Sequence, residues 1–469
     1  MTRESGPHDD TSGALAQEYC RSMHDVIIQL ARRIVASSWP AVNDTVGDEA
    51  VRAVINWLGS ALIGTRESFA EFDDASTGIG IEATALVMGK GFDALDIAAM
   101  TAEGAEALCY VDTHVPSMLS PSSAVGAALL PLAEHLASPG AAFVHAFLLG
   151  IEIACRAAMS VARDATNTAT SLACNALGAT AACARLAGLD EARTSTALSA
   201  AWQQASEQET VKGCAASAAR IALLATLAAK AGRVSDGNNE RASPASSFLE
   251  FTTDPIENWG SQWQFARLAY HAYPCALFLH PVAEACLQLK RAHHLTQRQI
   301  AVIEVRMPPQ RYIHDRGADP ADSADARHSI EHVAAVALLD GTVGLAQFEP
   351  ARVRSARMRE VRAKVRTLPD EQLLDSAAHV RITVTSGETI ERHVRCALGH
   401  PMRPLGDHDL SEKFRSQAAD ILATDQAERL LGLAWNLRAL PDVGGLIRSS
   451  IPDDLYEPAE LPGSPLIPR

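Results

Sequence analysis

Aromatic residues are scarce in this chain, since Phe, Trp and Tyr together make up 5% of its 469 residues. Its core must therefore be filled by Ala, Leu, Val and Ile. A surplus of basic residues is also lacking, because 41 Lys and Arg stand against 56 Asp and Glu, a net charge of −15. Nucleic acids and anionic membranes attract clusters of Lys and Arg, so we expect neither as a partner. A small anionic substrate stays open, because one pocket can be basic within an acidic protein.

Paired cysteines and signature loops are absent too. The nine cysteines are scattered with no C-x-x-C pair, which argues against a disulfide scaffold, a zinc ribbon or an iron–sulfur site. There is no phosphate-binding glycine loop, no G-x-S-x-G and no H-E-x-x-H. The N-terminus has no signal-peptide apolar region, and the longest uncharged stretch, 165–184, is rich in Thr, Asn and Ser. We therefore expect a soluble, cytoplasmic protein that needs no cofactor and no metal.

Helical periodicity dominates the first half of the chain. Residues 15–37 read as one amphipathic helix, and 48–65 begin at an acidic residue and end near Gly64, as helices tend to. The apolar faces are rich in Ala, which lets helix axes approach closely. Further helices are predicted at 79–90, 92–109, 122–137, 140–161, 169–187, 191–206 and 210–232.

The pattern changes after residue 233. Residues 301–308 are rich in β-branched side chains and predict a strand, whereas 325–341 predict a helix. Two further strand segments follow at 361–370 and 379–396, the second as a hairpin. After Gly399 the helical pattern returns.

We therefore expect a mostly α protein, in which a large all-helical domain carries an inserted, smaller α+β lid domain. A cleft between two such domains is a common place for a small-molecule site. The predicted limits are 1–13 for a disordered tail, 14–265 and 400–445 for the two parts of the helical domain, 266–399 for the lid domain, and 446–469 for an extended, Pro-rich tail.

Two charged or titratable groups stand out by their position. Lys212 lies at the start of a helix of small apolar residues, so it is either an end-cap residue or an ammonium aimed into a cleft. His328 and His332 are four residues apart, hence on one face of the predicted helix. Such a pair can bind a metal if a third ligand exists, or it is a helix end with two half-buried imidazoles.

Several segments, in this order, resemble the MmgE/PrpD family. They are YVDTH followed by SPSSAVGAALLPLAE, ETVKGCAASAARIALLA, HAYPCALFLHPVAEA, ARHSIEHVAAVALLDG and LGHPMRPLGDHDLSEKF. The family includes 2-methylcitrate dehydratases, cis-aconitate decarboxylases and iminodisuccinate epimerases. The resemblance implies a helical domain with a smaller lid domain, usually paired as a homodimer.

The chain departs from the family pattern at several positions of the implied active site. Ser120 stands where the family has a second His, and Val111 stands where it has an acidic residue. His271 replaces a family Lys, and His332 replaces a family Tyr. A further family His is lost near Asn167. The scaffold is thus similar while the chemistry of the pocket differs, and fold alone does not carry function across such changes.

The family reactions share proton transfer at a carbon next to a carboxylate or carbonyl. Such a site needs a base, an acid for the leaving group and a cation for developing negative charge. His271 and His332 suit the acid and base, Lys212 suits the cation, Asp112 could orient an imidazole, and His114 is a further acid. We expect these five catalytic residues to converge on one cleft between the domains. The predicted substrate-binding residues are Thr113, Ser120, Tyr273 and His280.

The leading hypothesis is a dehydratase-type lyase that acts on a small, polar, acidic metabolite in a specialised biosynthetic pathway. An isomerase or epimerase with two opposed bases is an alternative, as is a decarboxylase or a cyclase. A different class is a family member without catalysis that acts as a binding partner. The lost histidines favour that reading, whereas the new imidazoles of His271 and His332 argue against it.

Overall fold

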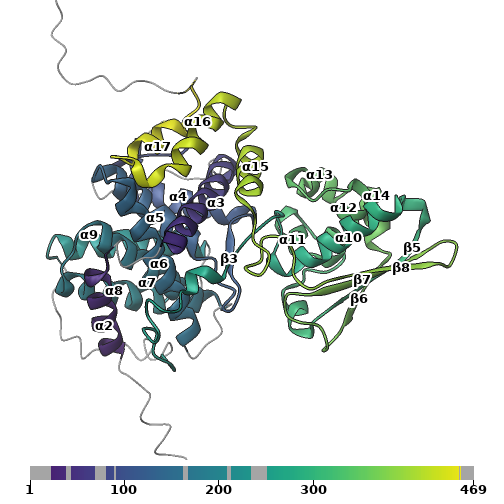
Figure 1. Cartoon of the computed structure of the whole chain (residues 1–469), viewed down its shortest axis with the longest axis horizontal. Helices are drawn as coiled ribbons and strands as arrows, with labels where there is room; N and C mark the ends of the chain where they lie inside the picture. The colour runs from purple at the N-terminus through teal and green to yellow at the C-terminus, as the bar shows by residue number, and fades with distance from the viewer. Residues whose placement is uncertain are drawn as a thin grey trace, which may run out of the picture.

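The computed structural model describes residues 23–38, 44–68, 81–88, 91–161, 167–208, 213–233, 251–453 and 455. These residues form two lobes that meet at one side (Figure 1). The larger lobe is helical, and the smaller lobe combines helices with a sheet. The predicted N-terminal tail and Lys212 lie outside the described residues.

The larger lobe is built from Ala-rich helices, as the sequence predicts. The helix after Asp93 begins where this carboxylate accepts a hydrogen bond from the amide of Leu95, and Asn167 and Asp190 cap two others in the same way. Within the described residues its helices are α2 (Met23–Ala36), α3 (Asp44–Ser68), α4 (Ala94–Ala107), α5 (Pro121–His135), α6 (Gly140–Ser160), α7 (Thr168–Leu186), α8 (Glu191–Ser206), α9 (Cys214–Lys230), α15 (Asp407–Ala418), α16 (Thr424–Trp435) and α17 (Gly444–Ser449).

Small residues let these helices cross closely. A Cβ atom added to Gly64 on α3 would collide with the backbone oxygen of Gly104 on α4. Gly150 on α6 faces Gly178 on α7 in the same manner. Short distances between helices thus close a core that has few aromatic side chains to fill it.

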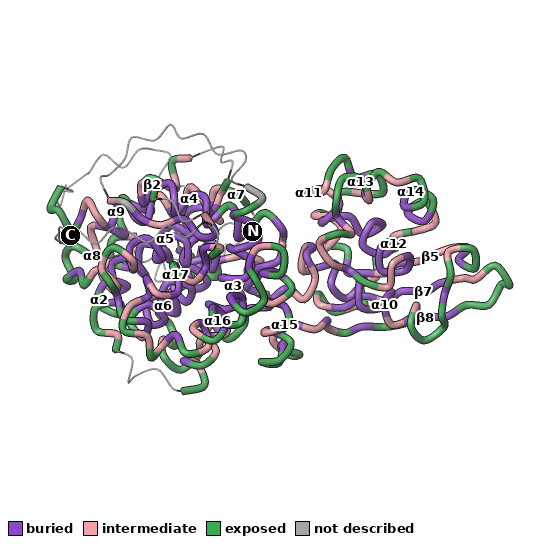
Figure 2. Tube along the Cα trace, turned by 90° about the horizontal axis from the view of Figure 1, so that it is seen from above, coloured by how far each residue is buried: buried purple, intermediate pink, exposed green. Residues whose placement is uncertain are grey.

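α6 lies in the middle of this lobe. Its length and composition would suffice to cross a membrane, but 89% of its apolar window is buried inside the protein. It packs against α5 and α7, and Figure 2 shows buried residues throughout this part of the lobe. α6 is therefore packed as a core helix.

The predicted helix at 79–90 is wrong. In the described part of that segment β1 (Glu82–Thr84) pairs antiparallel with β2 (Gly91–Asp93), and Ala83 lies opposite Phe92. The sequence carries Gly89 and Gly91 directly after the apolar run, and glycines weaken a helix interior while favouring a tight connection.

One further predicted element is divided in the structure, another begins later, and the predicted C-terminal tail is shorter. The predicted helix 325–341 becomes α11 (Ser323–Ala326) and α12 (Ile330–Asp340), because Ser329 accepts a hydrogen bond from the amide of His332 and starts a new helix. The predicted strand 361–370 begins only at Val365, after a helix has ended. The predicted extended tail from residue 446 instead begins within α17, because Leu446 and Ile447 are buried in the core.

A four-stranded sheet in the order β6-β5-β7-β8 forms one layer of the smaller lobe. The central strand β5 runs parallel to β6 and antiparallel to β7, and the β7–β8 hairpin turns at Gly387 with φ +90°. Helices α10 and α12 pack together beside the sheet (Figure 1). The elements are α10 (His280–His293), β5 (Ile300–Met307), α13 (Pro350–Val353), α14 (Ala356–Arg362), β6 (Val365–Pro369), β7 (Ala378–Val384) and β8 (Thr389–Val394).

Each lobe has its own hydrophobic core. The larger core takes in buried side chains up to Tyr270 and again from Leu405 onward, and the smaller core takes in those from Cys275 to Val394. Where the lobes meet, β3 (Asp112–His114) pairs antiparallel with β4 (Leu268–Tyr270). The predicted fold class, mostly α with a smaller α+β part, is confirmed.

Candidate functional site

A cavity of about 350 Å³ opens where the two lobes meet. Its walls come from the end of α4, from β3 and the loop after it, from α7, and from the segments that lead into the smaller lobe. Apolar side chains such as Leu277 and Phe278 line one part. The polar side chains that line it are Glu106, Cys109, Thr113, Ser120, Ser171, His271, His314 and His328.

Strand β3 decides which predicted residues reach this cavity. Successive side chains of a strand point to opposite faces, so Thr113 points one way while Asp112 and His114 point the other. Thr113 lines the cavity, whereas Asp112 and His114 are fully buried. The prediction that Asp112 and His114 belong among the cavity's catalytic groups is therefore corrected: they face the interior of the helical lobe.

His271 follows β4 and lies at the wall of the cavity. Its Nδ1 lies 2.7 Å from the backbone oxygen of Cys109, which can only accept, so Nδ1 carries the proton. Its Nε2 then has a free electron pair and accepts from the Thr113 hydroxyl at 2.9 Å, and Ser120 lies 3.4 Å beyond Thr113. Burial lowers the pKa of His271 to about 4, so this imidazole is a neutral proton acceptor at neutral pH.

Glu106 in the last turn of α4 lines the same cavity. Burial raises the pKa of its carboxyl group to about 7, and the nearby negative charge of Asp112 adds to the rise. The backbone amide of Ala215 opposes this shift by a hydrogen bond to the carboxylate. A large share of Glu106 is thus a neutral carboxylic acid at neutral pH, able to donate a proton.

The sequence hypothesis missed Glu106 as a site residue. The available signal was weak, since Glu106 is one of three acidic residues in an otherwise small and apolar helix, shortly before the DTH segment. His328 was weighed only as a metal ligand or a half-buried group. It lines the cavity from the turn before α12, with its Nε2 4.0 Å from the Cys109 sulfur.

His332 lies in the core of the smaller lobe and does not line the cavity. Its side chain is fully buried beside Phe348, its Nε2 donates to the backbone oxygen of Gln347 at 3.0 Å, and Arg362 lies 3.3 Å from its Nδ1. Burial lowers its pKa to about 4. The structure therefore places His332 in a hydrophobic core and outside the cavity, and not in the cleft where the prediction put it.

The predicted pairing of His328 with His332 on one helical face is also wrong. His328 lies in the turn between α11 and α12, and only His332 belongs to a helix. In the part of the chain that the structure describes, no three side chains of His, Cys, Asp or Glu form a group that could hold a metal ion.

A buried network supports the cavity wall from inside the helical lobe. Ser122 donates a hydrogen bond to Asp112, whose pKa burial raises to about 6. Lys413 on α15 donates to the Asn56 side chain and to the backbone oxygen of Tyr110, both at 2.6 Å. Burial lowers the pKa of Lys413 to about 7, while the Asp112 carboxylate favours its charged form. These contacts hold the segment that leads into β3.

Two other predicted residues pack behind His271. The ring of His280 lies edge-on to the ring of His271 with centroids 4.9 Å apart, and edge-on to the ring of Tyr273 with centroids 5.3 Å apart. The Nε2 of His280 donates to the backbone oxygen of Cys275, and burial lowers the pKa of His280 well below its usual range. Of the four predicted substrate-binding residues, Thr113 and Ser120 thus line the cavity, and the other two support it.

Comparison with known proteins identifies the scaffold. The MmgE/PrpD N-terminal domain model matches residues 28–253, and the MmgE/PrpD C-terminal domain model matches residues 273–439. Cis-aconitate decarboxylase of Homo sapiens is 29% identical over 187 residues, covering 37% of this chain and 38% of that protein. The Mus musculus enzyme is 29% identical over 193 residues, covering 39% of each chain.

A third relative is the cis-aconitate decarboxylase-like protein oryM of Aspergillus oryzae, which is 25% identical over 201 residues, 40% of this chain and 41% of that protein. The chain thus spans about two fifths of the length of the curated relatives it matches. The two family models together cover most of the chain, across both lobes. This protein belongs to the MmgE/PrpD family.

Proposed function

We propose that this protein is a lyase that transfers a proton at a carbon next to a carboxylate of a small acidic metabolite. One observation carries the proposal. The same cavity holds a neutral imidazole, His271, whose pKa lies at about 4, and a carboxyl group, Glu106, whose pKa lies at about 7. Ordinarily a glutamic acid has a lower pKa than a histidine, and here the order of the two pKa values is reversed. The proton therefore resides on Glu106, and the imidazole of His271 is neutral.

This division of roles suits a dehydration. The Thr113 hydroxyl turns to donate to Ser120, which frees the electron pair of His271 Nε2. His271 Nε2 then takes the proton from the carbon next to the substrate carboxylate, and Glu106 gives its proton to the departing hydroxyl, which leaves as water. Thr113 and Ser120 form a short hydroxyl chain beside the base and can position the substrate. Lys212 remains our proposed cation for the carboxylate or the developing enolate, as expected from its sequence context.

Decarboxylation is the second candidate function, because the relatives that match this chain are named as cis-aconitate decarboxylases. Loss of carbon dioxide leaves electron density on carbon that must be protonated. Glu106 in its acid form is suited to deliver that proton. The two reactions differ in product, so one assay with two readouts separates them.

The test uses the purified full chain with cis-aconitate and with a panel of β-hydroxy di- and tricarboxylic acids. Carbon dioxide release reports decarboxylation, and new alkene absorbance reports dehydration. We expect turnover in one readout and a loss of about 10²-fold or more in His271→Asn. His393→Asn on the exposed face of β8 is the matched control and keeps the rate. If the folded protein yields neither product from any acid, the lyase proposal fails and a non-catalytic binding role is favoured.

A further inference from the structure

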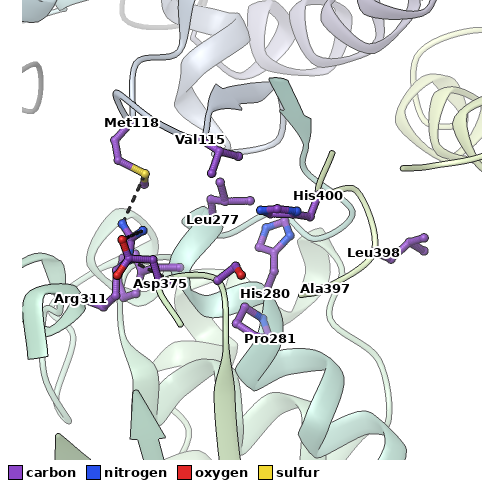
Figure 3. A pocket seen from close by; sticks show the side chains of 12 residues that line it. Val115, Met118, Leu277, His280, Pro281, Arg311, Asp375, Ala397, Leu398 and His400 are labelled. Carbon is purple, nitrogen blue, oxygen red and sulfur yellow. Dashed lines mark hydrogen bonds and ion pairs between the residues drawn. The ribbon is translucent and has the colours of Figure 1, made fainter. Parts of the chain in front are cut away.

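A second, smaller pocket adjoins the main cavity. It lies between the loop after β3 and the start of α10, and Figure 3 shows Val115 and Met118 on one side and Leu277 and Arg311 on the other. Most of its lining is apolar. It offers about 30 Å³, against about 350 Å³ for the main cavity, which is room for a chain of roughly two or three carbon atoms.

Most polar side-chain atoms of this pocket already have partners within the protein, but the buried Nδ1 of His280 has none. Arg311 Nε donates to the backbone oxygen of Asp375 at 3.2 Å, and one of its other nitrogens lies 3.4 Å from the sulfur of Met118. His280 Nε2 donates to a backbone carbonyl at 3.1 Å, and His400 Nδ1 accepts from a backbone amide at 3.2 Å. A ligand group that entered here would find mainly unoccupied apolar surface.

The pocket and the main cavity share three wall residues, Met118, Leu277 and Phe278. Met118 has a left-handed backbone with φ +58°, which is rare for a residue with a side chain. Its unbranched thioether is the most adaptable apolar side chain, so this wall can shift to admit a substituent. The two spaces are therefore placed to hold two parts of one molecule.

We propose that this second pocket is an alkyl subsite, which holds a short apolar substituent of the acid bound in the main cavity. The inference rests on the proposed function, because it assumes that the acid head group occupies the cavity beside His271. It narrows the substrate class to a di- or tricarboxylic acid that carries a short, unbranched alkyl group. An acid without that group would leave the apolar walls of the subsite unfilled.

Calorimetric titration of the full chain with succinate and with methyl-, ethyl-, propyl- and hexylsuccinate tests the subsite without requiring turnover. We expect the Kd to fall about threefold to fourfold for each added carbon up to propyl, the value for burying one CH₂ group, and to fall no further for hexyl. A Kd that does not change along the series overturns the proposal, and so does the absence of binding by every acid.

A substitution checks that the gain arises in this pocket. Val115→Phe fills the subsite from the loop after β3, and we expect the ratio of the succinate Kd to the propylsuccinate Kd to drop to about one. Val35→Phe, the same change on the exposed side of α2, is the matched control and keeps the original ratio. A Val115→Phe protein with the original ratio overturns the proposal.

The outcomes separate the subsite from the lyase proposal. Graded binding without turnover of any acid would refute the lyase and keep the alkyl subsite. Turnover of acids with no dependence of binding on alkyl length would refute the alkyl subsite and keep the lyase.

Discussion

The pH dependence of turnover tests the proposed acid and base most directly. The reactive form of the free enzyme has His271 neutral and Glu106 protonated. Because the pKa of His271 lies at about 4, activity should rise as the pH increases through 4. Because the pKa of Glu106 lies at about 7, activity should fall as the pH increases through 7. We therefore expect a bell-shaped profile of kcat/KM with its maximum between these two values.

The size of the alkaline fall follows from the Glu106 pKa. The protonated fraction of a group with a pKa of about 7 drops from about one half at pH 7 to about one eleventh at pH 8. The kcat/KM should thus fall about fivefold over this interval and about tenfold for each further pH unit. Profiles of kcat/KM report groups of the free enzyme, which is the state with an empty cavity.

Glu106→Gln keeps the shape of the side chain and removes its titration. We expect the kcat/KM of this variant to fall by up to about 10²-fold and to stay level between pH 6 and 9. Glu388→Gln is the matched control, because Glu388 is exposed in the turn between β7 and β8 and does not line the cavity. An alkaline limb that persists unchanged in Glu106→Gln would refute the assignment of Glu106 as the acid, as would a profile of the original protein without that limb.

Four further predictions concern packing, stability, charge and assembly. Gly64→Ala should lower the free energy of unfolding in urea by at least about 1–3 kcal/mol, because the new Cβ would meet the backbone of α4. Gly432→Ala has open space around it and should raise the free energy of unfolding by up to about 1 kcal/mol. Equal effects of the two substitutions would contradict this packing. The pKa of His332 is about 4 in the folded protein and 6.5 ordinarily, so protonation of the unfolded chain below pH 6.5 should lower the free energy of unfolding by about 2 kcal/mol at pH 5. Urea unfolding of His332→Gln should therefore show a smaller loss of stability between pH 7 and pH 5. Lys212→Ala should reduce turnover about a hundredfold, and the exposed Lys230→Ala should not; similar rates would remove Lys212 from the site. Light scattering should give twice the mass of one chain, and the single-chain mass at all concentrations would exclude the homodimer.

Local sequence signals were enough for most of the secondary structure. The helices after Asn167 and Asp190 begin at capping residues whose side chains accept hydrogen bonds from backbone amides of the first turn. A few neighbouring residues therefore determine where each of these helices starts. The hairpin that turns at Gly387 needs a positive φ, which glycine supplies at little cost. The helix prediction for 79–90 failed because this apolar run is short and its pattern suits a strand as well as a helix, and its strand β1 pairs with β2 beyond the segment.

Part of the candidate site was also visible in the sequence. The DTH segment and the segment with His271 stand out as polar groups at the edges of apolar runs, and the structure joins them through β3 and β4. The bond between His271 and Thr113 spans 158 positions, so no local pattern could show it. The resemblance to a family supplied these positions, and the tertiary structure supplied their contacts.

What only the tertiary structure decided is which side chains reach the cavity and how they ionise. The face of β3 that meets the cavity selects Thr113 over Asp112 and His114, because a strand alternates its side chains and the neighbouring elements set which face is open. The new helix start at Ser329 sends His332 into a core and leaves His328 in the cavity. The pKa of Glu106 rises through loss of water around its carboxyl group, which depends on segments far along the chain. The sequence by itself determined where most helices of the larger lobe begin and end and which titratable residues are present, because those signals are local, whereas burial is a property of the assembled fold.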